Sequence, residues 1–161
     1  MSSSTTTLTS WVKNSLTNLF ESSLASEEEI FQTSFESIFS PHAQIISNHE
    51  RTTADAFKEN ILNRAFAATR VSVNWKEVFE VPNAEDAAHQ TGIVAGCIVV
   101  TRSLKFRIRA APAQSNWTMV FSARVESEPS IQNGDPRRIV EFIQTSFDMP
   151  APIHLQGIPA S

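Results

Sequence analysis

The spacing of the apolar residues changes at about Ala68, and this change constrains the fold more than any other feature of the chain. Before Ala68 the apolar residues recur every three or four positions, which is typical of an α-helix with one buried face. After Ala68 they alternate with polar residues, which is typical of a half-buried β-strand. The sequence therefore predicts an α+β domain that places its helices first and its sheet second.

The first part of the chain predicts three helices. The first covers residues 8–20. The second begins at a capping box at residues 26–29 and ends before Pro41, which disfavours helical geometry in the residue that precedes it. Thr52 or Thr53 caps the third helix with its side-chain oxygen.

A short strand at residues 43–47 and a polar turn separate the second and third helices. Four strands follow the third helix, and residues 110–116 are expected to form a loop between two of them. In the longest strand Gly92 and Gly96 can permit a bend or close packing, and a bulge is expected near Arg102. The four strands are expected at residues 71–82 (where the alternation slips near the far end), 91–109, 117–126 and 138–147.

Composition excludes several classes of protein. The chain has 161 residues, 41% of them apolar, and a formal charge of −4, which suits one globular domain and argues against a nucleic-acid binder. There is one cysteine, Cys97, and no apolar run that resembles a membrane span or a signal peptide. We expect a cytoplasmic protein with no membrane or nucleic-acid partner. Its domain is expected at residues 8–149, with a flexible tail at 1–7 and a second tail at 150–161.

The order of these elements resembles the nuclear transport factor 2-like superfamily, which includes SnoaL-like enzymes and binding proteins. The resemblance is carried by Phe35-Glu-Ser-Ile-Phe-Ser-Pro-His-Ala-Gln-Ile-Ile, by Phe57 to Leu62 and by Arg138-Ile-Val-Glu-Phe, and residues 92–112 are similar to uncharacterised fungal members. It implies a cone-shaped, curved antiparallel sheet wrapped around three N-terminal helices, with an apolar cavity inside. It also implies a homodimer that forms through the outer face of the sheet.

Strand alternation selects the candidate ligand-binding residues. Trp117 and Phe121 share the apolar face of their strand, which is expected to face the helices and the cavity. Trp75 and Arg102 have the same parity as their buried neighbours. Trp75, Trp117, Phe121 and Arg102 are therefore predicted to contact a ligand, with ordinary core packing as the alternative for the aromatic rings.

The candidate catalytic residues are Glu141, His42 and His89. Glu141 alternates with apolar neighbours, so it is either a general acid or base with a raised pKa or an exposed residue on the convex face. His42 and His89 flank predicted strands and could move protons at a cavity mouth, or they could be hydrated. Limonene epoxide hydrolase-like relatives activate water with an arginine and two acidic residues, but Arg124 and Glu126 are expected on the face opposite the cavity.

The remaining motifs predict little further chemistry. The sequence contains no tyrosine, so any role that a relative gives to a tyrosine hydroxyl is missing or replaced. No His, Cys or acidic spacing suits a metal, and no glycine loop suits a phosphate, so neither a metal nor a cofactor is expected. Cys97 is expected to be a packed, unreactive thiol.

Three functions remain open from the sequence. The first is a pocket-bearing protein that binds a small hydrophobic molecule and forms a homodimer. The second is a cofactor-free isomerase, cyclase or dehydratase that acts on a hydrophobic metabolite. The third is a dimeric protein-interaction module whose cone is filled with side chains.

Overall fold

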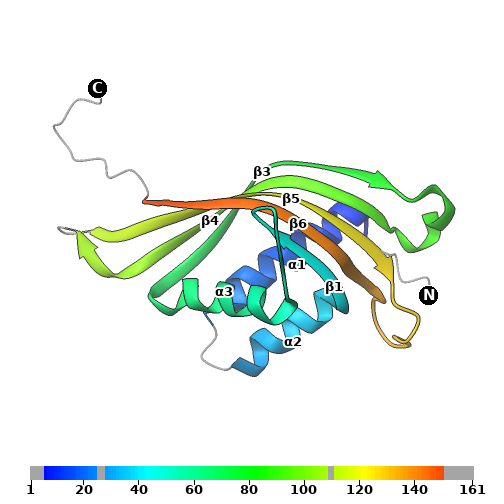
Figure 1. Cartoon of the computed structure of the whole chain (residues 1–161), viewed down its shortest axis with the longest axis horizontal. Coiled ribbons are helices and arrows are strands. Elements are labelled where there is room, and N and C mark those ends of the chain that lie inside the picture. Colours follow the sequence, from blue (N-terminus) through cyan, green and yellow to red (C-terminus); the bar gives the residue numbers. More distant parts are fainter. Residues whose placement is uncertain (1–5, 25–27, 109–110, 151–161) are drawn as a thin grey trace.

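The computed structural model describes residues 6–24, 28–108 and 111–150, and Figure 1 shows their arrangement. As predicted, the three helices precede the four long strands. The elements in chain order are α1 (Leu8–Ser22), α2 (Glu28–Ile38), β1 (Phe39–Ser47), β2 (Glu50–Thr52), α3 (Ala54–Phe66), β3 (Ala68–Pro82), the 3₁₀ helix η1 (Ala84–His89), β4 (Gly92–Ile108), β5 (Ala111–Ser127) and β6 (Arg137–Pro150).

Side-chain caps define where two of the helices begin. The Thr7 hydroxyl accepts a hydrogen bond from the backbone of Ser10 at 3.3 Å, and the Thr53 hydroxyl accepts one from Ala56 at 3.0 Å. The capping box predicted at residues 26–29 lies partly outside the described residues, as do most of the two predicted tails. Among the described helices, none is both long enough and apolar enough to cross a membrane.

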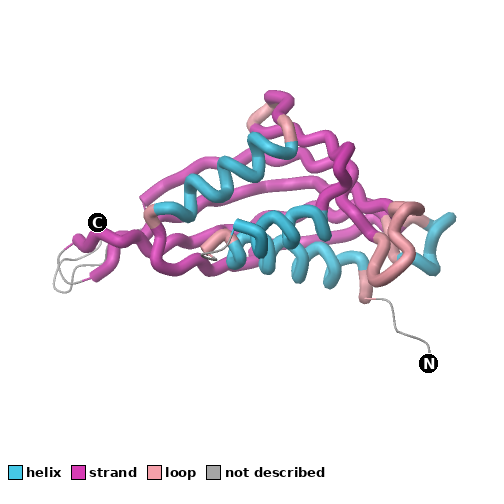
Figure 2. The backbone as a smooth tube through the Cα atoms, turned by 90° about the horizontal axis from the view of Figure 1, so that it is seen from below, coloured by secondary structure: helices cyan, strands magenta, loops and turns pink. Residues whose placement is uncertain are grey.

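The six strands form one curved, open sheet in the order β2-β1-β6-β5-β4-β3. Strands β3 to β6 pair antiparallel, and β1 runs parallel to β6. The helices lie against one face of the sheet, here called the inner face (Figures 1 and 2). The predicted fold class is confirmed, and the β1–β6 pairing adds a parallel neighbour to the four antiparallel strands.

Two glycines let strands β3 and β4 approach one another closely. A Cβ atom at Gly96 would lie 2.6 Å from the carbonyl oxygen of Glu77. Gly92 has a φ of +142°, and a Cβ atom there would lie 2.3 Å from the carbonyl oxygen of Val81. The register of the two strands shifts between Trp75 and Glu77, beside the predicted slip in alternation. Close packing and a bulge together bend this part of the sheet.

Two segments differ from the sequence prediction. Residues 111–116 are not a loop but the first part of β5, because β4 extends far enough to pair with them, as Thr101 does with Asn116. Strand β1 begins at Phe39 and therefore contains Pro41. Its register against β6 jumps between Phe39 and Gln44, so the ladder is interrupted where proline has no N–H to donate.

The predicted alternation along β5 is confirmed, and it defines the two faces of the sheet. The inward side chains are all buried, and they are Trp117, Met119, Phe121, Ala123 and Val125. On the opposite face, here called the outer face, Val120 is 58% exposed and its neighbours on β6, Ile143 and Phe147, are 41% and 57% exposed. The sheet therefore buries one apolar face and leaves apolar side chains exposed on the other.

Aromatic rings from five elements fill most of the space between the helices and the inner face. Phe35 of α2 stacks on Phe39 of β1 with ring centroids 4.6 Å apart, and Phe39 meets Phe142 of β6 edge to face at 5.7 Å. Phe142 stacks on Phe121 of β5 at 5.5 Å, and Phe121 meets Trp75 of β3 at 5.8 Å. Such contacts add to the free energy of apolar burial. The interior of the curved sheet is thus largely a packed core.

A fully buried guanidinium connects the start of α1 to the sheet. Arg137 donates hydrogen bonds to both carboxylate oxygens of Asp135 at 2.9 and 2.6 Å, and to the carbonyl oxygens of Thr6 at 2.7 Å and Gln90 at 3.3 Å. Its guanidinium lies 5.4 Å from the centre of the Trp11 ring. Burial raises the pKa of the Asp135 carboxyl, but the hydrogen bonds and positive charge of Arg137 outweigh burial, so the net pKa is lowered.

Replacing Asp135 by asparagine is expected to lower the free energy of unfolding at pH 7 by about 1 kcal/mol, because the carboxylate is partly exposed. A carboxyl with a lowered folded pKa stabilises the fold above its unfolded pKa, and that contribution is lost as the pH falls through the folded pKa. Urea unfolding should therefore show that the difference in free energy of unfolding between the wild type and the Asp135 variant shrinks as the pH is lowered from 7 to about 3. Glu59→Gln, at an exposed position of α3, is the control. If the difference does not depend on pH, the charge of the Asp135 carboxylate does not stabilise the fold.

Candidate functional site

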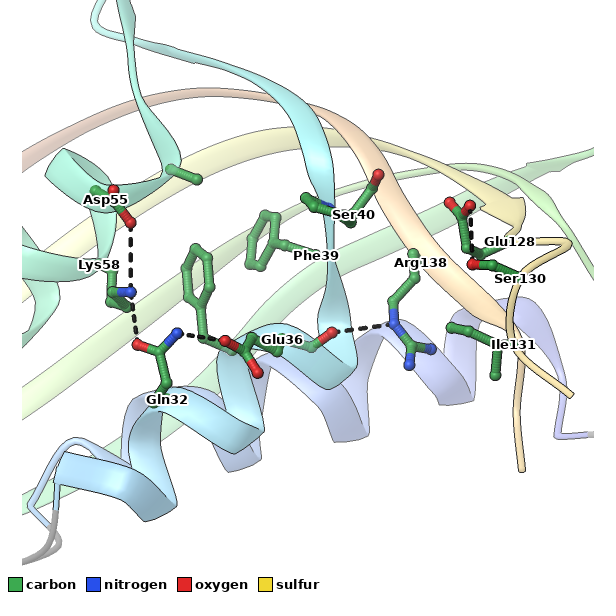
Figure 3. A pocket seen from close by; sticks show the side chains of 13 residues that line it. Gln32, Glu36, Phe39, Ser40, Asp55, Lys58, Glu128, Ser130, Ile131 and Arg138 are labelled. Carbon is green, nitrogen blue, oxygen red and sulfur yellow. Dashed lines mark hydrogen bonds and ion pairs between the residues drawn. The ribbon is translucent and has the colours of Figure 1, made fainter. Parts of the chain in front are cut away.

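One hollow of the described part of the chain is a surface groove of about 480 Å³ (Figure 3). It lies between α2, the first turns of α3, β1 and the connection from β5 to β6. Phe35 and Phe39 supply its apolar floor, and Figure 3 shows Lys58 and Arg138 on either side of Phe39. A groove of this volume could hold a small molecule.

The cations of the groove are already engaged with neighbouring groups. Lys58 donates to Gln32 Oε1 at 2.6 Å and pairs with Asp55 at 3.4 Å. Arg138 Nε donates to the carbonyl oxygen of Glu36 at 3.1 Å, near the end of α2. Burial lowers the pKa of Arg138, which nearby Asp135 and Glu128 raise in part. These contacts connect α2 to α3 and to the sheet, so the groove's charges have a sufficient structural role.

A second hollow lies between α3 and the inner face of β5 and β6, and we call it the chamber. It has a volume of about 100 Å³. Its apolar lining comes chiefly from Phe57 and Trp117. The residues that line it are Ser47, Asn48, Thr52, Ala56, Phe57, Asn60, Arg64, Trp117, Gln144 and Ser146. The chamber is a part of the curved sheet's described interior that the aromatic core leaves open.

Two buried polar atoms of the chamber lining lack hydrogen-bond partners among the described residues. They are the Trp117 Nε1 donor and the Gln144 Oε1 acceptor, on side chains that are 2% and 4% exposed. Leaving a buried donor or acceptor unpaired costs about 1–3 kcal/mol. Unpaired buried groups are uncommon in native proteins, and each therefore needs an explanation. The donor and the acceptor belong to two residues that line the same chamber, so a polar ligand there that displaces either side chain slightly can pair with both.

Arg64 lies at the mouth of the chamber and covers Trp117. The centre of its guanidinium is 4.0 Å from the centre of the indole ring, a cation–π contact. Arg64 also donates to Asn60 Oδ1 at 2.6 Å and forms an ion pair with Asp148. Beyond it lies an open space of about 370 Å³, the vestibule, which Asn63 and Arg102 also line. Arg64 thus separates the chamber from the vestibule.

Arg102 approaches the same carboxylate from β4. Its Nη2 lies 3.1 Å from Asp148 Oδ1, and its Nη1 donates to the backbone carbonyl oxygen of Arg64 at 2.5 Å. Burial lowers the pKa of Arg102, the charge of Asp148 raises it and Arg64 lowers it further, with a net shift downward. Arginine still remains protonated in proteins. The vestibule therefore holds two permanent positive charges and one carboxylate.

The four predicted ligand-binding residues lie on the inner face, two of them at the chamber and vestibule and two in the aromatic core. Trp117 lines the chamber, and Arg102 lines the vestibule. Trp75 and Phe121 contact one another in the core, and the Trp75 indole donates to Thr17 Oγ1 at 3.0 Å. The register shift expected near Arg102 follows it, between Ser103 and Arg107.

The three predicted catalytic residues do not meet at one site. Glu141 lies opposite Arg124 in the register of β5 and β6, on the outer face and away from the chamber. His42 is exposed on β1, in a hollow at the sheet edge beside β2. His89 ends η1, and its side chain lies outside what the structure describes. Their catalytic roles stay predictions, and none of these positions contributes to the chamber.

Sequence reasoning missed Arg64, Gln144 and Asp148. Arg64 lies on the same helix face as Phe57 and Ile61, at the end of the pattern, where a cation usually suits the helix terminus. Gln144 and Asp148 share one parity of β6, and this parity was a usable signal. This signal was obscured because the register against β5 shifts between Arg124 and Val125. As a result Ile139 and Phe142, an odd and an even position, both face inward, and the alternation of β6 is interrupted between them.

No protein-family model and no curated protein matches the sequence. Several solved structures are similar to the chain in fold. AclR, a proposed hydroxylase from Streptomyces galilaeus, is 13% identical with a TM-score of 0.55 over 86% of this chain and 76% of its own. IdmH, a proposed polyketide cyclase from Streptomyces antibioticus, is 13% identical with a TM-score of 0.53 over 83% of this chain and 90% of its own. A nuclear transport factor 2-like protein of unknown function from Pseudomonas aeruginosa is 9% identical with a TM-score of 0.53 over 86% of this chain and 97% of its own. The chain therefore has the nuclear transport factor 2-like fold.

Proposed function

We propose that the chain binds a small, mainly apolar molecule in the chamber, with Trp117 and Gln144 hydrogen bonding to its polar groups. The observation that carries this proposal is that Trp117 and Gln144, which both line the chamber, each bury a polar atom without a partner among the described residues, Nε1 and Oε1. A ligand that carries both an acceptor and a donor relieves both desolvation costs at once. Phe57 and the face of Trp117 offer apolar surface to the rest of the molecule.

The lining favours binding over proton transfer. The described residues that line the chamber include no carboxylate, imidazole or thiol, and general acid–base catalysis needs such a group within hydrogen-bond reach. Asp148 is the carboxylate at the vestibule, and two arginines engage it. A cofactor-free isomerase, cyclase or dehydratase is thus the alternative, of which only the cyclase matches the name given to IdmH, and it would require Asp148 to leave those arginines.

Replacing Gln144 by leucine tests the unpartnered acceptor without opening a cavity. Leucine has a similar volume and no polar atom, so the free energy of unfolding is expected to rise by about 1 kcal/mol. Urea unfolding would measure the change. Gln44→Leu, at an exposed position of β1, is the matched control and should change stability by less than about 0.5 kcal/mol. A clear loss of stability in the Gln144 variant would show that its amide has a structural partner.

Phenol and toluene, which differ by a hydroxyl in place of a methyl, test ligand binding directly. An engineered apolar cavity of about 150 Å³ accepts benzene, and the chamber has about 100 Å³, so a ring of this size fits when it extends past Arg64 towards the vestibule. We expect titration calorimetry to give phenol about tenfold higher affinity than toluene, because its hydroxyl can pair with the chamber's polar atoms. Gln144→Leu should reduce that preference, and Gln44→Leu should not. If neither probe binds, the proposed function is wrong.

The outer face supports a further part of the proposal, a homodimer. Val120, Ile143 and Phe147 are exposed on neighbouring strands. Arg124 and Glu141 lie on the same face. A two-fold interface requires a self-complementary surface, and a face with one residue of each charge can meet this requirement. These features fit a second copy of the chain better than a strongly charged partner.

Val120→Glu is expected to convert the dimer to a monomer, because it places a charge in the centre of this apolar face. Light scattering after size-exclusion chromatography would report the mass. Phe66→Glu is the control, since Phe66 is 82% exposed but lies at the end of α3, away from the outer face. A monomeric wild type, or an equal loss of mass in both variants, would contradict the dimer.

A further inference from the structure

We propose that the molecule bound at the chamber carries a carboxylate, which takes the place of Asp148 between Arg64 and Arg102. This inference rests on the proposed function, and it adds the chemical class of the ligand. It is argued from the charge of the vestibule, from its unused hydrogen-bond donors and from the way Arg64 covers Trp117.

The charge of the vestibule is the first argument. Arg64 and Arg102 both pair with the single carboxylate of Asp148, which leaves one positive charge in excess. The other described residues that line the vestibule, Asn60 and Asn63, are neutral. A monoanion balances this excess, and it is attracted by both guanidinium groups.

The unused donors are the second argument. Arg102 Nε is buried and has no partner among the described residues, like Trp117 Nε1. Arg102 is held in place by the carbonyl oxygen of Arg64 and by Ser115 Oγ, to which Nη2 donates at 3.1 Å. Two of the three unpaired atoms around the chamber and vestibule are therefore N–H donors on well-positioned side chains. A carboxylate offers acceptor lone pairs for such donors.

The third argument is that Asp148 and Arg64 can give way at low cost. The Asp148 side chain is 38% exposed and that of Arg64 is 23% exposed. Ion pairs near the surface contribute little to stability, so an incoming carboxylate can replace this one. If the Arg64 guanidinium rotates away from Trp117, the indole ring is uncovered and the chamber joins the vestibule. The ligand's flat apolar part can then lie on Trp117 while its carboxylate meets Arg102 and the displaced guanidinium of Arg64.

Benzoate and benzamide are matched probes, because they have the same shape and differ in charge. At pH 7 we expect titration calorimetry to give benzoate about tenfold higher affinity than benzamide. Arg64→Gln should remove this preference. Asp148→Asn removes the competing carboxylate and should strengthen benzoate binding several-fold while leaving benzamide unchanged. Lys76→Gln, at an exposed position of β3, removes one positive charge elsewhere and is the control.

The indole N–H resonance of Trp117, assigned with Trp117→Phe, would locate the bound probe and should shift on addition of benzoate. Equal affinities for the two probes, with phenol still bound, would overturn the carboxylate inference and leave the proposed function standing. Benzoate binding that Lys76→Gln weakens as much as Arg64→Gln would also overturn it, because the attraction would then be nonspecific. If phenol, benzoate and benzamide all fail to bind, the proposed function fails and the inference with it.

Discussion

The packing of aromatic rings inside the curved sheet limits where the inner face can bind a ligand. Rings from α2, β1, α3, β5 and β6 contact one another in a continuous core, from the Phe35–Phe39 stack to the Phe121–Phe142 stack. Interiors packed in this way have few voids larger than a water molecule. Beside this core the chamber stays open, between Phe57, Trp117 and the polar side chains of Gln144 and Asn60.

The polar side chains at that boundary are positioned by the sheet itself. Arg102 pairs with Ser115 across β4 and β5, and Trp117 pairs with Asp148 across β5 and β6. Cross-strand partners project from the same face, so the ladder brings a cation, an indole and a carboxylate together without a loop. Arg64 completes the group from the last turn of α3. A site on strands and a helix is more rigid than one on loops, and this suits selective binding.

Strand parity predicted the inward positions of Trp117 and Arg102, because alternation is preserved over most of β4 and β5. Parity alone could not separate Trp117 at the chamber from Phe121 in the core. That difference depends on which side chains of the helices lie opposite each of them. Arg64 could not be identified, since its partner Asp148 is 84 residues away along the chain. Gln144 was missed because the bulge beside Glu141 changes the parity of β6. Local pattern thus predicts the face of a residue, whereas long-range pairing determines its neighbours.

Strands β5 and β6 contribute both to the chamber on the inner face and to the proposed dimer interface on the outer face. Because their side chains alternate between the faces, each surface can be changed without the other. On β6, Gln144 points into the chamber, whereas Ile143 lies on the outer face. On β5, the exposed Val120 lies between two buried residues, Met119 and Phe121. A substitution on one face leaves the side chains of the other in place as long as the register holds. Loss of the dimer through Val120 therefore need not abolish ligand binding, and loss of binding through Gln144 need not change assembly. If the two properties changed together, the strands would transmit a change of register from one face to the other.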